Sequence, residues 1–455
     1  MADLTQTDFT AVLQPYMPVF YCSFLATLIL TPLMRVLAHR HGIVDDPDGR
    51  RKVHTQPIAY LGGVSIFLGW LAGVSISVFL RPHNAADIML MKVQVPPGVL
   101  LGAATVVLFG LTDDVYSLSP KIKLFGQLLA ALFLIMPGLG SLGTGENYFI
   151  GTGRGPAWMI IEPMARLGYL SQEFASSHLM VLMATVFSGV LAVVVIIGAC
   201  NATNLLDGLD GLCSGVTGIM SLGYLILAVY LATTVIGSEG GQPLDPTRIT
   251  LSLALLGAVM GFLPYNYNPA SIFMGDTGSM FLGYICGVMI LLFGQHGTVR
   301  WFLSAIIIFG LPMMDTLLAI VRRKLNGKPI FSPDSNHFHH FLVKKGLSVR
   351  KAVMLSYGVA AVFVSFALVI VIMPAPLAIG IYLVLFGYIL VSAFKMGMIF
   401  QHAAPAAANT QLNMAVLQAS PDGAGSGVNL TAKAGAPPKV KEAPPAVAAT
   451  AELGG

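Results

Sequence analysis

The 455-residue chain has few charged side chains, and this scarcity identifies its class. Only 10% of its residues are Asp, Glu, Lys or Arg, and 55% are hydrophobic. Soluble domains contain about 25% charged and roughly 45–50% apolar residues, so this chain cannot cover itself with a water-compatible surface. Because apolar runs of about 20 residues recur along it, we predict a polytopic membrane protein. The net charge of +4 is small and gives no indication of nucleic acid as a partner.

Three further features are missing. The cysteines (Cys22, Cys200, Cys213 and Cys286) lie in apolar or motif-flanking sequence without ligand spacing, so we expect neither disulfides nor a cysteine metal site. The N-terminus carries Asp3 but no basic segment, which argues against a cleaved signal peptide. No Gly-x-x-x-x-Gly-Lys-Ser/Thr loop occurs, which argues against an ATPase of that class.

Apolar segments predict eleven transmembrane helices, because a backbone in lipid must satisfy its hydrogen bonds within each segment. The expected spans are residues 16–38, 60–80, 97–112, 122–138, 178–199, 212–236, 250–264, 277–294, 301–321, 352–373 and 376–399. The third and seventh are short, which makes them candidates for tilted or broken helices. The predicted fold class is therefore all-α.

Three segments lie outside these spans. Residues 1–15 form an expected external N-terminus, and residues 139–177 a Gly-rich external loop insertion in a transmembrane domain of residues 16–400. Residues 401–455 are rich in Ala, Pro and Gly, which predicts a disordered tail.

Basic residues concentrate in alternate loops and thereby orient the chain. Lysines and arginines gather within residues 35–52, 121–123, 322–328 and 344–351, whereas the opposite loops contain few. By the positive-inside rule, the basic loops and the C-terminal tail are cytoplasmic and the N-terminus is external. All the polar motifs described next fall on the cytoplasmic side.

Carboxylates follow the third span as an adjacent pair, Asp113-Asp114, with Lys121 and Lys123 close behind. Two neighbouring carboxylates repel each other unless a cation offsets the repulsion. A solvated helix end explains a single acid, but the pair followed by two lysines favours a functional role.

Two further polar runs also lie beside spans, and they contain Asn201, Asn204, Asp207 and Asp210 in one and Asn266 and Asp276 in the other. Such oxygen-bearing side chains suit Mg²⁺, which takes one or two protein oxygens plus substrate phosphates. An Asn-, Asp- and Gly-rich turn explains the composition but not this clustering. A simple helix cap is the competing explanation for Asp276, which precedes a span.

Three histidines (His337, His339 and His340) precede Lys344 and Lys345. Their spacing fits neither a zinc-protease helix nor a zinc finger, and the lysines disfavour a cation. We therefore expect the histidines to form an anion-binding cluster, with Arg322 and Arg323 as contributors. Lys52 and His54 are basic residues of the same kind. Positive-inside topology alone would explain the lysines and arginines but not the histidines. Groups suited to Mg²⁺ beside groups suited to phosphates indicate phosphoryl transfer.

These motifs, in this order, resemble those of the polyprenyl-phosphate N-acetylhexosamine-1-phosphate transferases, over roughly residues 16–400. The resemblance implies an eleven-span helical enzyme of the bacterial inner membrane with a cytoplasmic active site. It implies transfer of a sugar-1-phosphate from a UDP-N-acetylhexosamine to undecaprenyl phosphate, with release of UMP. Mg²⁺ is the implied cofactor, with Mn²⁺ as an alternative, and membrane lipids surround the protein. A homodimer is a further possibility.

The residue patterns and the resemblance together assign the site residues. The predicted metal ligands are Asn204 and Asp276; the predicted catalytic residues are Asp113, Asp114, His337, His339 and His340; the predicted substrate-binding residues are Lys52, His54, Lys123, Asn201, Asp207, Asp210, Asn266, Arg322 and Arg323. A phosphate monoester is mostly dianionic at pH 7 and hardly needs a base. We therefore favour positioning and electrostatic roles for Asp113 and Asp114, with Asp113 as base or covalent nucleophile the rival.

Two alternatives remain at this point. The His-x-His-His form resembles the branch of the family that uses UDP-N-acetylglucosamine, but UDP-N-acetylmuramoyl-pentapeptide or another UDP-acetamido sugar is an alternative donor. Ser117 and Ala59-Tyr60 depart from the common family pattern and leave the fine donor specificity open. A cation-coupled transporter would instead carry charged residues within its spans; Asp315, in the ninth span, is the main such residue.

Overall fold

The computed structural model describes residues 9–45, 57–79, 95–136, 167–175, 177–235, 245–294, 299–327 and 337–395, with residues 139, 161, 164, 165 and 329. Lys52 and His54, most of residues 139–177 and all of residues 401–455 lie outside the described residues. Within the described part the secondary structure is helical apart from one short strand pair and one isolated bridge, which confirms the all-α class.

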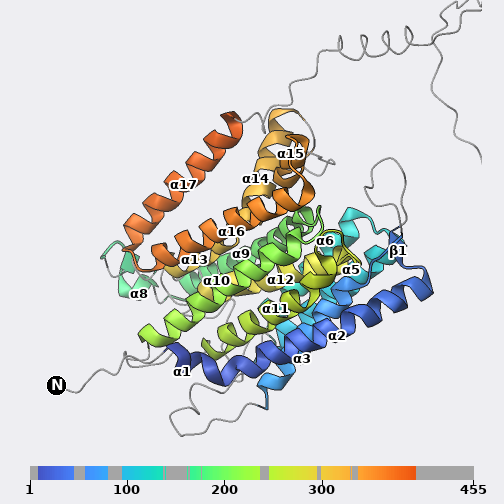
Figure 1. Cartoon of the computed structure of the whole chain (residues 1–455). Coiled ribbons are helices and arrows are strands. Elements are labelled where there is room, and N and C mark those ends of the chain that lie inside the picture. Colours follow the sequence, from blue (N-terminus) through green and yellow to red (C-terminus); the bar gives the residue numbers. More distant parts are fainter. Residues whose placement is uncertain are drawn as a thin grey trace, which may run out of the picture. The chain divides into compact units, whose positions relative to one another are not determined.

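The elements follow one another along the chain as shown in Figure 1. They are α1 (Phe9–Leu13), the 3-10 helix η1 (Gln14–Tyr16), α2 (Met17–His41), β1 (Val44–Asp45), β2 (Ile58–Ala59), α3 (Gly62–Ser77), α5 (Pro97–Tyr116), α6 (Pro120–Ile135), α8 (Gln172–Ala175), α9 (His178–Leu206), α10 (Leu212–Val235), α11 (Asp245–Asn266), α12 (Gly275–Gly294), α13 (Val299–Ile308), α14 (Gly310–Leu325), α15 (Phe338–Lys344), α16 (Val349–Val371) and α17 (Ala375–Lys395). The strands are antiparallel, with Val44 opposite Ala59.

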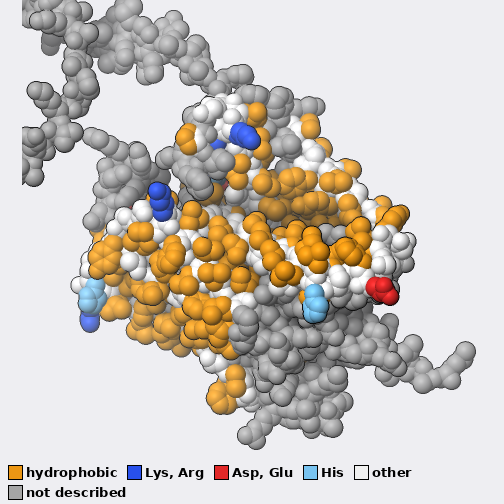
Figure 2. All heavy atoms as spheres, turned by 180° about the vertical axis from the view of Figure 1, so that it is seen from behind, with side chains coloured by type: hydrophobic (Ala, Val, Ile, Leu, Met, Phe, Trp, Pro, Cys, Tyr) orange, Lys and Arg blue, Asp and Glu red, His pale blue; other side chains and the backbone are white. Residues whose placement is uncertain are grey.

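Long apolar helices make this a multi-pass membrane protein. Among the described residues, 7 helices are long and apolar enough to cross a membrane, or 8 if the pair α13–α14 forms one span. The shorter helices α3 and α17 are also apolar, and α6 covers the remaining expected span. Figure 2 shows a broad band of hydrophobic side chains on one face, with charged and histidine side chains at its margins. The figure of eleven spans stays a prediction.

The ninth expected span is broken, whereas the third and seventh are not. Helices α13 and α14 meet at an angle of 78°, and Pro312 stands in the first turn of α14. A proline lacks the amide hydrogen and its ring clashes with the carbonyl four residues earlier, which favours a bend just before this position. Helix α5 instead runs unbroken to Tyr116, and α11 tolerates Pro264 in its last turn. Of the two possibilities for the third and seventh spans, a break is therefore not found, and a tilt stays a prediction.

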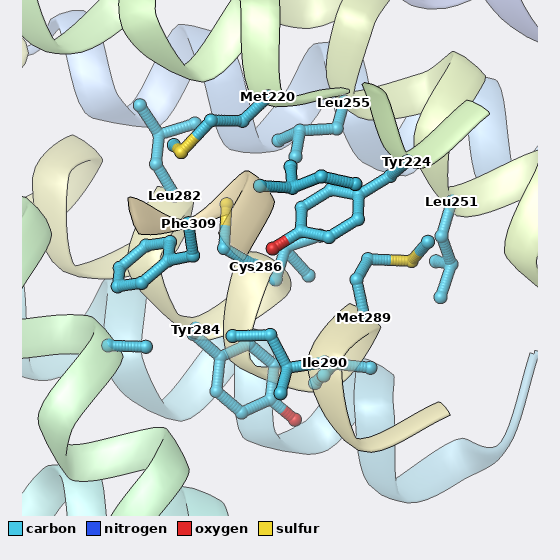
Figure 3. Packing of buried hydrophobic residues seen from close by; sticks show 14 of the residues in the cluster. Met220, Tyr224, Leu251, Leu255, Leu282, Tyr284, Cys286, Met289, Ile290 and Phe309 are labelled. Carbon is cyan, nitrogen blue, oxygen red and sulfur yellow. The ribbon is translucent and has the colours of Figure 1, made fainter. Parts of the chain in front are cut away.

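Helix α12 occupies the centre of the described helices (Figure 1). It contacts α3, α5, α9, α10, α11 and α13, and every residue from Thr277 to Gly294 is buried. Figure 3 shows the side chains of its second half packed against Met220 and Tyr224 of α10 and Leu255 of α11. A helix that is apolar all round is stable only when it is enclosed in this way.

The C-terminal end of α12 is matched by a buried cation. The fully buried Arg248 of α11 donates from Nη2 to the carbonyl oxygen of Leu292 at 2.5 Å. Its guanidinium carbon lies 5.3 Å from the centre of the Phe293 ring. A cation at a helix C-terminus is stabilised by the helix dipole, and the aromatic face adds a second attraction.

Glycines allow α3 and α5 to approach the first turns of α12. A Cβ atom on Gly63 would fall against the backbone of Gly278 and the carbonyl oxygen of Met274, and one on Gly110 would lie 2.6 Å from the Cα of Thr277. Gly63 also donates its amide hydrogen to the carbonyl of Met274 at 3.0 Å. Small residues at a helix crossing let two backbones pack closely, as is common in membranes.

The Gly63→Ala variant is expected to unfold at a lower temperature than the wild type. Its methyl group meets backbone atoms that cannot move aside, and overpacking costs about 1–3 kcal/mol. Gly198→Ala in α9 is the matched control, because a Cβ there meets nothing within 4 Å and a helical Gly→Ala change stabilises by roughly 0.5–1 kcal/mol. Thermal unfolding of both purified variants in one detergent checks this. Equal melting temperatures would contradict the packing argument.

Candidate functional site

Four helix ends bring the predicted acids and amides together. Asp113 and Asp114 lie in the last turn of α5, Lys123 in the first turn of α6, Asn204 in the last turn of α9 and Asp276 in the first turn of α12. Helices α5, α6, α9 and α12 contact one another in sequence around this point. The polar runs predicted beside the spans are thus partly helical, and the helix geometry itself points these side chains at a common centre.

Lys123 connects two of the carboxylates. Its Nζ lies 2.6 Å from Oδ2 of Asp113 and 2.5 Å from Oδ2 of Asp276. Asn204 donates from Nδ2 to Oδ1 of Asp276 at 2.9 Å and to Oγ of Ser279 at 3.0 Å. One ammonium group therefore offsets the repulsion between two acids from different helices.

The same acids can hold a divalent cation. Asp113, Asp114 and Asp276 each offer an oxygen, and these oxygens lie within 4.8 Å of one another. Carboxylate oxygens are the ligands that Mg²⁺ requires. The ammonium of Lys123 lies between two of these carboxylates, so the site already accepts a positive charge. The donor set therefore fits the predicted metal, with Asn204 orienting Asp276 through its amide.

Asp114 accepts hydrogen bonds from the first residues of α12. Its Oδ1 accepts from the backbone of Asp276 at 2.7 Å, and its Oδ2 accepts from the backbone of Thr277 at 3.1 Å and from Oγ1 of Thr277 at 2.5 Å. The first amide hydrogens of a helix have no partner within the helix, and a carboxylate also matches the positive end of the helix dipole. Gly275 makes room for this contact with a φ of 67°, because a Cβ there would meet the Asp114 carboxylate.

An amide pair, formed by the half-buried Asn201 and the buried Gln127, lies one helical turn deeper. Asn201 donates from Nδ2 to Oε1 of Gln127 at 2.7 Å and to its own helix at Ile197, and Gln127 donates to Sδ of Met280 at 3.4 Å. Asn201 connects α9 to α6 through this hydrogen bond, and its predicted contact with substrate stays a prediction. Gln127 escaped the sequence analysis, although its position four residues after Lys123 placed it on the same helix face.

A cavity of about 200 Å³ lies beside this centre. Its lining residues are Tyr60, Asp207, Gly208, Leu209, Asp210, Asn266, Phe273 and Gly275. Burial, together with repulsion from Asp276, Asp114 and Asp210, raises the pKa of the Asp207 carboxyl well above its ordinary value. An acid held among other acids beside a cavity is typical of a functional site.

Two of the lining residues, Asp210 and Asn266, form hydrogen bonds between the loop that follows α9 and the loop that follows α11. Asp210 accepts from Nδ2 of Asn268 at 2.9 Å and from the backbone of Ala270 at 3.0 Å. In return, Oδ1 of Asn266 accepts from the backbone of Gly211 at 3.2 Å and from Oγ of Ser214 at 2.9 Å. Both residues were predicted to bind substrate, and both also brace the loop that follows α9 against the loop that follows α11.

His339 borders the same cavity from behind. It is 1% exposed, and neither ring nitrogen has a hydrogen-bond partner among the described residues. A Cβ on Gly208 would collide with its Nε2, so the ring lies directly against the cavity lining. Burial, with repulsion from His340 and His337, lowers the pKa of His339 to about 3.

The other two histidines pack against His339. The ring centroids of His339 and His340 are 4.3 Å apart, and those of His337 and His339 are 5.9 Å apart with an interplanar angle of 8°. Arg322, at the end of α14, is 2% exposed, and its neighbour Arg323 is half-buried. The three predicted histidines are thus brought together.

The two departures from the family pattern differ in position. Ser117 is exposed, adopts a left-handed φ of 52° and ends α5. Tyr60 lines the cavity, and its ring lies 5.9 Å from that of Phe273. Of the two positions, Tyr60 is therefore the one that can contact a bound donor.

Asp114→Asn is expected to destabilise the protein as well as to impair the site. The asparagine keeps one acceptor oxygen but turns an NH₂ group toward the amide hydrogens of α12, and hydrogen bonds to charged groups contribute about 1.5–3 kcal/mol each. Thermal unfolding should show a loss of about 2 kcal/mol or more. Asp113→Asn serves as the comparison, because among the described residues Asp113 accepts a single backbone hydrogen bond, from Leu118, beside its ion pair with Lys123. Equal losses in the two variants would refute the capping role.

The contribution of His339 to the stability of the wild type is expected to fall as the pH drops from about 6.5 toward 3. In that range unfolded His339 binds a proton at its ordinary pKa of 6.5, whereas folded His339 stays neutral to about pH 3. Its contribution is therefore fully present above pH 6.5 and declines by about 1.4 kcal/mol per pH unit below it. His339→Gln removes this contribution, so its melting temperature should depend less on pH between 7.5 and 5.5. An unchanged dependence would show that His339 is not the group responsible.

Comparison with known proteins places these features in a family context. The sequence profile of glycosyl transferase family 4 matches residues 96–294. A Bacillus subtilis protein named "Probable undecaprenyl-phosphate N-acetylglucosaminyl 1-phosphate transferase" is 33% identical over 356 residues, which cover 77% of this chain and 84% of that protein. A decaprenyl-phosphate N-acetylglucosaminephosphotransferase of Mycobacterium tuberculosis is 31% identical over 73% of this chain and 76% of its own length. An undecaprenyl-phosphate alpha-N-acetylglucosaminyl 1-phosphate transferase of Salmonella typhi is 28% identical over 74% and 79%.

Proposed function

Since this chain belongs to the polyprenyl-phosphate N-acetylglucosamine-1-phosphate transferases of glycosyl transferase family 4, we propose that it transfers N-acetylglucosamine-1-phosphate from UDP-N-acetylglucosamine to undecaprenyl phosphate. The observation that carries the proposal is the junction of the acidic centre with the cavity. Asp276 of that centre directly follows Gly275 of the cavity lining. A diphosphate can therefore reach the acids while the rest of the donor occupies the cavity.

The reaction is a single phosphoryl substitution. An oxygen of the lipid phosphate forms a bond to the β-phosphorus of the donor, and the bond between that phosphorus and the bridging oxygen to the α-phosphate breaks. UMP leaves with the electron pair of that bond, and a polyprenyl-diphosphate sugar remains in the membrane. No net proton transfer is needed at the nucleophile, because a phosphate monoester is mostly dianionic at pH 7.

Positioning and electrostatic roles suit both members of the acidic pair. Asp113 pairs with Lys123 and accepts a hydrogen bond from the backbone of Leu118. Asp114 accepts hydrogen bonds from the first residues of α12. Groups with these contacts are held in place rather than poised to take a proton. A bound Mg²⁺ at Asp113 and Asp276 would neutralise the diphosphate and stabilise the departing UMP. Lys123 lies where it can meet a phosphate oxygen.

The cavity residues suit the nucleotide-sugar part of the donor. Asp207 and Asp210 offer acceptors to hydroxyl and imide groups, and the half-buried Phe273 offers an aromatic face next to Tyr60. His339, which lies against Gly208, adds a neutral imidazole at this wall. Other UDP-acetamido sugars and UDP-N-acetylmuramoyl-pentapeptide are the competing donors, and the bacterial relatives named for N-acetylglucosamine favour the first assignment.

The proposal includes the cellular setting. Residues 16–400 are the catalytic membrane domain, placed in a bacterial inner membrane with its polar centre on the cytoplasmic side, where UDP-sugars are made. The basic loops support this orientation. The transporter alternative loses its main support, because Asp315 pairs with His337 at 3.0 Å instead of lining a path through the spans.

Purified protein is expected to release UMP from UDP-N-acetylglucosamine only when undecaprenyl phosphate and Mg²⁺ are both present. Asp276→Asn should reduce this rate by at least about 100-fold, because it removes a charge that holds both Lys123 and the metal, a loss of roughly 3 kcal/mol in transition-state stabilisation. Parallel assays with the competing donors identify the substrate. A folded protein that releases no UMP from any UDP-amino sugar would refute the proposed function.

A trapped phospho-enzyme would overturn the role proposed for Asp113. The substitution as written passes through no covalent enzyme intermediate, so incubation with donor labelled in the β-phosphate should leave no label on the denatured chain. Label that is present in the wild type and absent from Asp113→Asn would make Asp113 the nucleophile.

A further inference from the structure

Asp315 is a buried acid that the reaction as described does not use. It lies on α14, five residues after the start of that helix, and is 2% exposed. Its Oδ2 lies 3.0 Å from Nδ1 of His337, and its Oδ1 accepts from the backbone amide of Phe338 at 2.8 Å. Both carboxylate oxygens are therefore directed at the first residues of the histidine segment, 22 and 23 positions further along the chain.

These contacts fix the orientation of the His337 ring. An ionised carboxylate accepts hydrogen bonds but donates none, so the contact of Oδ2 with Nδ1 favours the imidazole form that carries its proton on Nδ1. The second nitrogen, Nε2, is then left as an acceptor when the ring is neutral. The contact to Phe338 holds the start of α15 at the same time, so the ring and the backbone that carries it are positioned by one side chain.

A series of packing contacts leads from His337 to the cavity. The His337 ring stacks nearly parallel on His339, and His339 lies against Gly208, which lines the cavity. His339 has no hydrogen bond of its own within the described residues. Its position therefore depends on packing against its neighbours, and the neighbour that is itself fixed by a carboxylate is His337.

We propose that Asp315 is a positioning residue for the donor site: through His337 it seats His339 at the cavity that takes the nucleotide sugar. The kinetic consequences of this inference rest on the proposed function. The hydrogen bond between Asp315 and His337 rests on the described geometry alone. Asp315 does not touch the substrate. It acts by restricting two imidazole rings, and it explains why an acid is kept within an otherwise apolar span.

The kinetic test compares Asp315→Asn with Thr316→Val. Asparagine replaces one acceptor oxygen by a donor, which cannot hold Nδ1–H of His337 and the Phe338 amide together. Carboxylates that orient functional histidines at metal sites have effects of about 10–100-fold, and we expect a fall of that size in kcat/KM. Thr316→Val alters the next residue of α14, whose Oγ1 bonds only to the carbonyl of Pro312 among the described contacts, and should leave the rate unchanged.

The kinetic signature separates positioning from a loss of folding. The Asp315→Asn variant should raise KM for UDP-N-acetylglucosamine and leave KM for undecaprenyl phosphate unchanged. A merely structural defect would lower the active fraction, and hence kcat, with both KM values unaltered. Asp315→Glu, which keeps the carboxylate, should recover part of the lost activity.

A double-mutant cycle tests whether Asp315 works through His337. Adding Asp315→Asn to His337→Ala should cost little beyond His337→Ala alone, because residues that act as a unit are not additive. Full additivity of the two losses would overturn the proposal. A loss confined to kcat, or an Asp315→Asn variant as active as the wild type, would also overturn it.

Nitrogen-15 NMR of histidine-labelled protein gives a readout that needs no activity. The His337 signals are assigned by their disappearance in His337→Ala. In the wild type they should report a proton on Nδ1, and in Asp315→Asn this proton should shift toward Nε2. Unchanged signals would refute the hydrogen-bonding role. If the wild type releases no UMP from any donor, the proposed function fails, and this measurement still decides the fate of the Asp315–His337 pair.

Discussion

Complete enclosure of α12 is the constraint on which the rest of the molecule depends. A helix whose ends lie inside the protein presents amide and carbonyl groups that water cannot reach, and these must be satisfied by other segments. Asp114 meets this need at one end and Arg248 at the other. Charges of the correct sign thus stand at both ends of the helix dipole. Because Asp276 belongs to the same first turn, the interaction that stabilises the helix also fixes the central acid of the site.

The acidic centre shows how charge can be concentrated at the edge of a membrane. Three carboxylates from two helices lie close together, and the ammonium group of Lys123 pairs with two of them, Asp113 and Asp276. Repulsion among the acids is thereby kept high enough to favour a divalent cation, yet low enough for the helices to pack. The amide pair formed by Asn201 and Gln127 continues this polar contact one turn into the apolar region and holds α6 and α9 in register.

The sequence allowed the class of the fold to be predicted, and it singled out polar residues that the structure brings together, because both follow from local features. Scarce charge and recurrent apolar runs predict spans, and alternating basic loops predict which polar runs share a side. Pairings between distant segments could not be read in this way. Asn268 meets Asp210, and Asp315 meets His337, only because helices fold back on each other. The bend near Pro312 had a local signal in the proline, but the sequence analysis considered breaks only in the short third and seventh spans.

Mutual bracing of the two motif loops limits how the donor cavity can evolve. Asn266 holds residues 211 and 214, and Asp210 holds residues 268 and 270, so neither loop can retreat without displacing the other. A cavity with a fixed frame adapts to a bulkier sugar through single side chains at its rim instead of through backbone shifts. The side chain of Tyr60 takes no part in these side-chain hydrogen bonds, although the backbone on either side of it bonds to Phe273. Divergence among relatives with different donors should therefore accumulate at such independent wall positions, while the braced frame is inherited unchanged.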